Sequence, residues 1–334
     1  MIYKSTSPLR VSLFGGGTDY PEYFKKNKGA VLGFAINKYI YCTAIKMHGS
    51  TKSNFRISYK KMEEANKINE IKHPVILNIL KDNKFFLKDK WHFVSLADLP
   101  TGTGLGSSSS FSVCFSNLIY GIQKIKKNNS FFAKYTFNLE KNILKENVGV
   151  QDSLFASYGG FNLFKFNSNK IIKQEIKFHK SVLDEFNQSL MLIYIGGQRK
   201  ASKQLNQQLK NTINGKNIST LSRMYQNVFE AKSIIESSNK KDTFKMLGEL
   251  MKENWDLKKS LSKNITSNKI DQVYTEAINS GAYGGKLCGA GGNGFMFFLI
   301  DKNKKKIFIN KFKSNFICTE INIDFDGVKF LNEN

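Results

Sequence analysis

The stretch that most strongly suggests chemistry is residues 100–110, which read PTGTGLGSSSS. Three closely spaced glycines and four serines follow a strand-like segment and precede an amphipathic helical pattern. A loop in this position can turn several backbone N–H groups toward one anion, and the helix adds unpaired donors and the positive end of its dipole. The stretch lacks the GK[ST] ending of a Walker loop. A phosphate cradle and a flexible turn whose serines cap the helix are both compatible with these residues.

A second glycine cluster, GAYGGKLCGAGGNGF, covers residues 281–295 and contains the spacing GxGxxG at Gly289, Gly291 and Gly294. That spacing binds dinucleotides when a strand precedes it and a helix follows it. Here a helical pattern comes before and the strand-like FMFFLI comes after, so the context disfavours an NAD site. The alternative is a tight connection from helix to strand, in which glycines let two backbones pack closely.

The third cluster, PLRVSLFGGGTDYPEYF, covers residues 8–24 and places three glycines after a strand predicted at residues 11–14. Asp19 stands just before Pro21, where a helix N-terminus is expected. Asp19 is therefore a candidate N-cap. Arg10 is likewise a candidate for a strand-end ion pair.

The elements that must position these clusters follow two periodicities. Strands are predicted at residues 11–14, 39–46 and 92–97, with a hairpin over residues 161–166 and 171–178. Apolar residues at helical spacing predict helices that begin near Ser107 and around residues 221–229, and a polar stretch at 198–216 predicts a loop and an exposed helix. Because 334 residues exceed one ordinary domain, we predict two domains with a boundary at residues 179–185.

The three clusters, in this order and with these separations, resemble the motifs of the GHMP kinases, the family of galactokinase, homoserine kinase, mevalonate kinase and phosphomevalonate kinase. PLRVSLFGGGTDY is similar to their first motif, LPTGTGLGSSSS to their phosphate loop and GGKLCGAGGNGF to their third motif. The resemblance implies an α+β GHMP kinase fold. It consists of an N-terminal α/β domain like ribosomal protein S5 domain 2 over residues 1–183 and a C-terminal α+β, ferredoxin-like domain over residues 184–334. The active site is expected between them.

The resemblance also implies ATP and Mg²⁺. The residues that would bind ATP are those of the phosphate loop: Pro100, Gly102, Gly104, Leu105, Gly106, Ser107, Ser108 and Ser109. In the family the second serine of GLGSS reaches the magnesium ion together with a glutamate on a following helix, which implies Ser108 and Glu140 here. A carboxylate on an apolar helix face is unfavourable unless a cation meets it. The alternative is that Glu140 lies at the edge of that face and reaches water.

For catalysis the resemblance implies Asp152, in ENVGVQD, and Arg10. A carboxylate beside the acceptor hydroxyl can take its proton as the bond to phosphorus forms. By the same resemblance Arg10 would orient that base or stabilise charge on the transferred phosphoryl group. Asp152 is also placed to cap the short helix predicted after it, and both roles can coexist.

Within the family, GGGTDYPEYF, ENVGVQD with ASYGGFNLF, and GAYGGKLCGAGGNGF look most like the subgroup that phosphorylates D-glycero-D-manno-heptose 7-phosphate at the anomeric hydroxyl. That subgroup supplies nucleotide-activated heptose for surface polysaccharide. Galactokinases carry a Glu–His pair where this chain has Gly16 and Gly17, which opens space for a larger or phosphate-bearing sugar. A free hexose such as galactose or fucose is the alternative acceptor. The residues implied in substrate binding are Arg10, Gly16, Gly17, Thr18, Asp19, Tyr20, Asp152, Arg199, Lys286, Gly291 and Gly292.

The formal net charge of +24 is compatible with nucleic acid, a membrane surface or an anionic small substrate. Arginines are few and lysines are scattered without interleaved aromatics, which argues against nucleic acid. No uncharged apolar stretch approaches the ~18 residues of a membrane span. The four cysteines lie far apart, which predicts neither a disulfide framework nor a zinc site.

We therefore predict a cytoplasmic enzyme with ATP and a sugar phosphate as its small-molecule partners and no nucleic-acid or membrane partner. Its state, monomer or homodimer, stays open. The alternatives from other classes are a non-catalytic ligand sensor with the same fold and a basic nucleic-acid binder.

Overall fold

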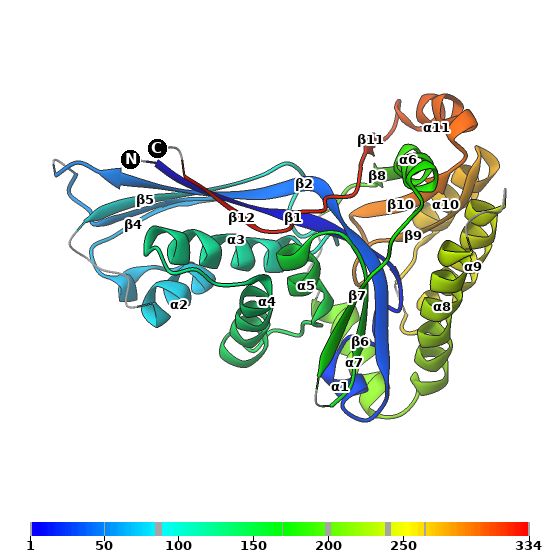
Figure 1. Ribbon diagram of the computed structural model, residues 1–334, viewed down its shortest axis with the longest axis horizontal. Helices are drawn as coiled ribbons and strands as arrows, with labels where there is room; N and C mark the ends of the chain where they lie inside the picture. Colours follow the sequence, from blue (N-terminus) through cyan, green and yellow to red (C-terminus); the bar gives the residue numbers. More distant parts are fainter. Residues whose placement is uncertain are drawn as a thin grey trace.

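The computed structural model describes residues 2–49, 51–83, 89–168, 170–197, 202–237, 242–263 and 265–332. They form two β-sheets with helices packed against them, and the long strands β1 (Ile2–Phe14) and β2 (Gly29–Met47) extend from the first sheet toward the second (Figure 1). None of the described helices is long and apolar enough to cross a membrane.

The first sheet has eight strands within the described residues, and its main order is β12-β1-β2-β5-β3-β4. All pairs are antiparallel except β3 with β5. β2 pairs with β6 through its first part and with β5 through its last part. The remaining strands of this sheet are β3 (Phe55–Ser58), β4 (Met62–Ala65), β5 (Lys90–Ala97), β6 (Phe161–Phe166), β7 (Ile171–Glu175) and β12 (Lys329–Asn332).

The helices of the first half contact one another and the first sheet, as Figure 1 shows for α2 to α5. α3 packs on β1 and β2 through the apolar face that the sequence predicted, with Phe115, Leu118 and Ile119 fully buried. The bounds are α1 (Pro21–Phe24), the 3₁₀ turn η1 (Ile68–Glu70), α2 (Pro74–Asp82), α3 (Ser107–Ile122), α4 (Asn129–Asn138), the π-helical turn η2 (Leu139–Ile143) and α5 (Gln151–Tyr158).

The second sheet is antiparallel, with the order β11-β8-β10-β9. Its strands are β8 (Leu190–Tyr194), β9 (Ala282–Leu287), β10 (Phe295–Ile300) and β11 (Ile317–Glu320). The helices of this half are α6 (Lys180–Gln188), α7 (Ser202–Ile213), α8 (Ile218–Glu236), α9 (Thr243–Ser260), α10 (Asn268–Asn279), the 3₁₀ turn η3 (Lys302–Lys304) and α11 (Lys305–Phe312). α9 and α10 pack on β9, whereas α8 reaches across to β1 and β2.

One hydrophobic cluster spans the two halves. The rings of Phe34 on β2 and Phe297 on β10 lie 5.9 Å apart, edge to face. The last strand, β12, returns to pair with β1, so the C-terminal end of the chain lies in the first sheet. Residues 179–185, where the sequence predicts a domain boundary, fall mostly within α6. The boundary therefore stays a prediction.

The predicted elements are present, with two differences. The helix predicted as exposed in the polar stretch is α7, and it buries Leu205, Gln208, Leu209 and Thr212. The other difference lies in the second glycine cluster. Residues 282–287 form a strand, β9, where the sequence predicts a direct connection from helix to strand. The predicted close approach of two backbones is confirmed there, because a Cβ on Gly284 would lie 2.3 Å from the Gly248 carbonyl oxygen of α9. Glycines that look like a loop in the sequence thus allow a helix to pack directly on a strand.

Candidate active site

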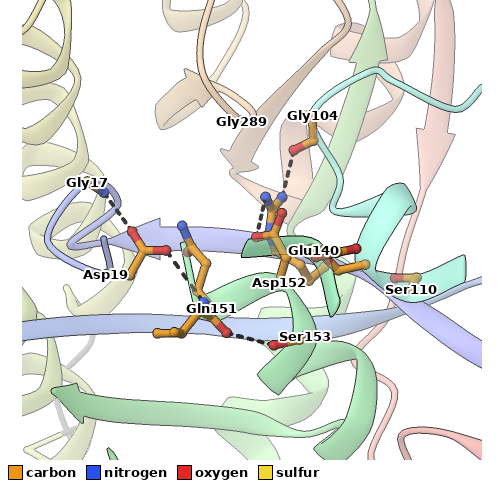
Figure 2. A network of polar contacts seen from close by, with 12 residues as sticks. Gly17, Asp19, Gly104, Ser110, Glu140, Gln151, Asp152, Ser153 and Gly289 are labelled. Atoms are coloured by element: carbon orange, nitrogen blue, oxygen red, sulfur yellow. Dashed lines mark hydrogen bonds and ion pairs between the residues drawn. The ribbon is translucent and has the colours of Figure 1, made fainter. Parts of the chain in front are cut away.

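A cavity of about 530 Å³ lies where the two halves of the chain meet. The first half contributes β1, the loop after it, the glycine loop and residues 145–152, and the second half contributes α7, α9 and the connection between β9 and β10. All three glycine clusters of the sequence therefore meet at one cavity. Figure 2 shows polar side chains at this cavity and beside it.

The glycine loop, residues 100–106, has the backbone conformation that its glycines permit. Gly102, Gly104 and Gly106 have φ values of +73°, +94° and +75°, in the left-handed region that other residues adopt reluctantly. Gly106 is the N-cap of α3 and no side chain caps that helix, so the serines after it do not serve as the cap. The loop thus turns directly into the helix N-terminus, where an anion is favoured.

Residues from both halves of the chain donate hydrogen bonds to the carbonyl groups of this loop. The Arg10 backbone N–H donates to Leu105 O at 3.0 Å, Arg10 Nη1 donates to Gly104 O at 2.6 Å, and the Phe295 N–H donates to Thr103 O at 3.1 Å. The N–H groups of residues 104–108 donate to no acceptor among the described residues. Fixed carbonyls and unused N–H groups are what a phosphate cradle requires.

The close approach of the second glycine cluster to this loop gives a testable consequence. Gly294 has a φ of +110°, and a Cβ there would lie 2.3 Å from Thr103 O. Gly294→Ala is therefore expected to lower the free energy of unfolding by about 2–4 kcal/mol, from backbone strain plus the steric clash. Gly215→Ala is the matched control, with φ at +79° and no atom within 4 Å of the added Cβ, and it should cost only about 1 kcal/mol. Urea unfolding of both variants measures the difference, and equal losses would contradict the proposed contact.

The serines that follow the loop have separate partners. Ser107 Oγ accepts a hydrogen bond from the Gly102 N–H at 3.0 Å, Ser109 Oγ donates to Glu140 Oε2 at 2.7 Å, and Ser110 Oγ donates to Pro8 O at 2.8 Å. Ser108 is exposed, lines the cavity, and its hydroxyl bonds no residue that the structure describes. Of the predicted ATP ligands, Pro100 and Leu105 do not line the cavity, and they shape the loop instead.

Glu140 is buried, at 1% exposure, in the π-helical turn η2, so it does not reach water as the alternative proposed. Its carboxylate accepts hydrogen bonds from Ser109 and from Ser112 Oγ, the latter at 3.0 Å. Burial raises the pKa of Glu140 to about 8, partly offset by the two serines, while Glu146 and Asp152 raise it further. No lysine or arginine among the described residues forms an ion pair with it. A single-turn π-bulge of this kind is often found at a functional site.

The residues present fit a magnesium ion. A buried carboxylate without a cationic partner and a nearby hydroxyl are hard oxygen donors, which Mg²⁺ prefers. No group of three or more His, Cys, Asp or Glu within the described ranges could hold a metal by itself, so nucleotide oxygens would have to complete the coordination. The structure places Ser109, not Ser108, in direct contact with Glu140.

Arg10 on β1 and Asp152 in the first turn of α5 form an ion pair at the cavity wall. The Nε and Nη2 atoms of Arg10 lie 2.9 and 2.8 Å from the same atom, Asp152 Oδ1. Oδ2 accepts no hydrogen bond from the part of the chain that the structure describes, and the side chain is 28% exposed. Burial alone would lower the pKa of Arg10, but the charge of Asp152 and its hydrogen bond outweigh that effect and raise it. Asp152 does not cap α5, whose N-cap is Val150.

Asp19 is buried beside the cavity and is held by the backbone. Its Oδ1 accepts from the Gly17 N–H at 3.0 Å and its Oδ2 from the Gln151 N–H at 3.4 Å. Burial raises the pKa of Asp19 to about 6 against these hydrogen bonds. The residue does not cap α1, because the N-cap of that helix is Tyr20. A Cβ on Gly149 would lie 1.9 Å from Asp19 Oδ2, so only glycine fits there.

The other residues of the first motif divide between cavity and scaffold. Gly16, Gly17 and Tyr20 line the cavity, as predicted for substrate-binding residues. Thr18 is fully buried, and its hydroxyl lies 2.8 Å from both Gly15 O and Ala30 O. Any effect of Thr18 on a sugar would therefore act through the shape of the loop.

Of the three residues of the third motif that are predicted to bind substrate, one lines the cavity and two do not. Lys286 lines the cavity, its Nζ donates to Leu13 O at 3.0 Å, and burial lowers its pKa to about 8. Gly289 lines the cavity, whereas Gly291 and Gly292 pack against Ile265 instead. Arg199, predicted to bind a sugar phosphate, lies outside the described residues.

The cavity also contains residues that the sequence did not single out. Lys258 Nζ donates to Leu287 O at 2.8 Å and to Gly289 O at 2.6 Å, which ties α9 to the third motif. It is one of many scattered lysines, so no sequence signal marks it. Asn206 and Gln208 belong to the polar stretch for which the sequence predicts a loop and an exposed helix. Gln151 directly precedes Asp152, and this position is the signal in the sequence that marks it.

Comparison with known proteins gives the family. The GHMP kinases N terminal domain matches residues 74–160 and the GHMP kinases C terminal domain matches residues 235–318, together just over half of the chain. The D-glycero-alpha-D-manno-heptose 7-phosphate kinase of Campylobacter jejuni is 29% identical over 315 residues, 90% of each chain. The galactokinase of Pyrococcus furiosus is 25% identical over 90% of this chain and 89% of its own.

Solved structures show the same fold. The structure of a D-glycero-D-manno-heptose 1-phosphate kinase from Bacteroides thetaiotaomicron matches with a TM-score of 0.77 over the whole of both chains, at 21% identity. The family matches and this likeness confirm the predicted α+β fold with its N- and C-terminal domains. The chain therefore belongs to the GHMP kinase superfamily and is a phosphotransferase that uses an alcohol group as acceptor.

Proposed function

We propose that the protein is an ATP- and Mg²⁺-dependent sugar kinase that phosphorylates the anomeric C1 hydroxyl of D-glycero-D-manno-heptose 7-phosphate, giving the 1,7-bisphosphate. The observation that carries the kinase chemistry is the Arg10–Asp152 pair, which faces the same cavity as the glycine loop. The choice of heptose is supported by the Campylobacter jejuni relative, which is 29% identical over 90% of both chains. The product would serve a pathway of nucleotide-activated heptose for surface polysaccharide.

In this proposal the triphosphate of ATP lies against the N–H groups of residues 104–108. Asp152 Oδ2 accepts the proton of the C1 hydroxyl while its oxygen attacks the γ-phosphorus, and the bond from that phosphorus to the bridging oxygen of ADP breaks. Arg10 holds Asp152 through Oδ1 and the loop through Gly104 O, so one side chain fixes the distance between base and phosphate. Its positive charge also stabilises the negative charge that develops nearby.

Glu140 would hold Mg²⁺ with Ser108, and the bound ion would neutralise charge on the phosphate oxygens. The contribution of the chain is to keep this carboxylate buried and oriented, which the hydroxyl groups of Ser109 and Ser112 do. Ser108 alone of these serines is exposed toward the cavity.

The sugar would occupy the part of the cavity beside Asp19 and the loop of Gly16 and Gly17. Because burial raises the pKa of Asp19 to about 6, its carboxylate is charged above that pH and can then accept hydrogen bonds from ring hydroxyls. Lys286 is a candidate partner for an anionic group of the substrate, because it is a buried cation at the cavity wall.

A panel of acceptors tests this proposal. With the purified protein, ATP and Mg²⁺, ADP release is expected with D-glycero-D-manno-heptose 7-phosphate and not with galactose, fucose or the unphosphorylated heptose. Turnover of galactose but not of heptose 7-phosphate would replace the proposed acceptor with a free hexose, in keeping with the galactokinase relative. Binding of ATP without ADP release from any acceptor would indicate a sensor.

A further inference from the structure

Gln151 is a buried side chain at the cavity for which the mechanism above has no use. It stands in the first turn of α5, is 8% exposed and lines the cavity. Its Oε1 is buried and has no hydrogen-bond partner among the residues that the structure describes. Its Nε2 donates to no acceptor within the described ranges either. A buried amide oxygen without a partner is unfavourable, and the Nε2 donor of the same amide is unused by the described residues as well, so the partner of this amide is expected to be a bound molecule.

The surroundings of Gln151 indicate what that partner is. Its backbone N–H holds Asp19, the next residue is Asp152, and Figure 2 shows its side chain between these two carboxylates. A ligand bound at the side chain of Gln151 would therefore lie between Asp152, the proposed base, and the buried carboxylate of Asp19. A phosphate is disfavoured because two carboxylates are close, whereas a neutral hydroxyl suits a neutral amide.

Gly16 leaves space in front of this amide. A Cβ on Gly16 would lie 3.4 Å from Ser12 Oγ and 3.9 Å from Gln151 Nε2. Ser12 Oγ is also buried and has no hydrogen-bond partner in the described part of the chain. Two unpaired polar groups therefore border the same small space, which a side chain at residue 16 would fill.

We propose that Gln151 is a substrate-binding residue that sets acceptor specificity, by hydrogen-bonding the hydroxyl adjacent to the one that is phosphorylated. The class of ligand is a sugar or other polyol with vicinal hydroxyl groups. For a C1 kinase this adjacent group is the C2 hydroxyl. The identity of the sugar rests on the proposed function, whereas the place of Gln151 beside Asp152 does not.

The test compares two proteins and two sugars. Gln151→Leu is expected to raise the KM for heptose 7-phosphate about tenfold or more, with the KM for ATP unchanged, because only the acceptor contact is lost. The 2-deoxy analogue of heptose 7-phosphate should show a similar loss with the wild-type protein and no further loss with Gln151→Leu. The proposal would be overturned if the losses from the substitution and from the missing C2 hydroxyl simply added, or if Gln151→Leu left the KM for heptose 7-phosphate unchanged.

Two further variants provide a control and a second test of the same contact. Gln188→Leu makes the same change at an exposed position of α6 and should leave both KM values as they are. Gly16→Ala fits the backbone, since Gly16 is not among the residues with positive φ, and should raise the KM for the acceptor alone. An unchanged acceptor KM in Gly16→Ala would count against the proposal.

A wrong choice of acceptor can be distinguished from a wrong role for Gln151. Wild-type protein that phosphorylates galactose and not heptose 7-phosphate refutes the proposed function. The comparison of galactose with 2-deoxygalactose, in wild type and Gln151→Leu, then decides the role of Gln151 by the same criterion.

Discussion

Asp152→Asn is expected to lower kcat by about 10²–10⁴-fold, the range that a general base usually contributes. The amide has the shape of the carboxylate and can still accept from Arg10, but it cannot take a proton from the acceptor hydroxyl. Because Gly104 O is held by Arg10 and not by Asp152, the phosphate loop should keep its position. The dissociation constant for a non-hydrolysable ATP analogue with Mg²⁺ should therefore stay the same. ADP-release kinetics and calorimetry measure the two quantities.

The control for this variant is Asp184→Asn, the same change at an exposed position of α6, which should leave both quantities unaltered. A variant at residue 152 that keeps the wild-type kcat would remove Asp152 from the role of base. A weakened ATP affinity with unchanged kcat would instead show that the Arg10–Asp152 pair serves only to hold the loop.

Glu140→Gln is expected to raise the Mg²⁺ concentration needed for half-maximal rate by about tenfold or more, because a charged ligand of the ion is lost. Burial raises the pKa of Glu140 to about 8, so below that pH the ion must displace a proton. The Mg²⁺ requirement of the wild type should then fall as the pH rises from 6 to 8 and level off above 8. The Mg²⁺ requirement of Glu140→Gln should not fall with rising pH in this way, because glutamine carries no proton that the ion must displace. Rates measured across Mg²⁺ concentrations at several pH values test both statements.

Stability provides the control for Glu140→Gln. The pKa of Glu140 rises from an ordinary value of 4.5 to about 8 on folding, so the stabilisation from its bound proton is full below 4.5 and lost as the pH rises through 8. Metal-free wild type should therefore lose stability over this window relative to the variant, since glutamine stays neutral. The Ser109 and Ser112 hydroxyls can rotate to suit the amide. Equal Mg²⁺ requirements in two equally folded proteins would contradict a metal-binding role.

The sequence predicts much of this site because its chemistry depends on backbone conformation. Glycines at residues 102, 104 and 106 are needed for positive φ, and such a requirement is visible as a residue type at a fixed spacing. Buried apolar faces, as on α3, are visible for the same reason. The family resemblance then implied roles for Arg10 and Asp152, and the structure brings these two residues into contact.

What the sequence could not predict depends on contacts between distant segments. The sequence predicts a connection where β9 lies, because glycines are typical of loops. Gly284 is instead required by the close approach of Gly248 on α9, a contact between distant segments. Thr18 bonds to backbone carbonyls and Lys258 to the third motif only in the folded chain. Nothing local distinguishes Lys258 from the other lysines, and Gln151 gains significance only from what surrounds it.

The most direct test of the account is a crystal structure of the protein with a non-hydrolysable ATP analogue, Mg²⁺ and heptose 7-phosphate. The account predicts the triphosphate against the backbone N–H groups of residues 104–108, with the C1 hydroxyl within hydrogen-bond distance of Asp152 Oδ2. A triphosphate bound elsewhere, with this loop empty, would contradict it.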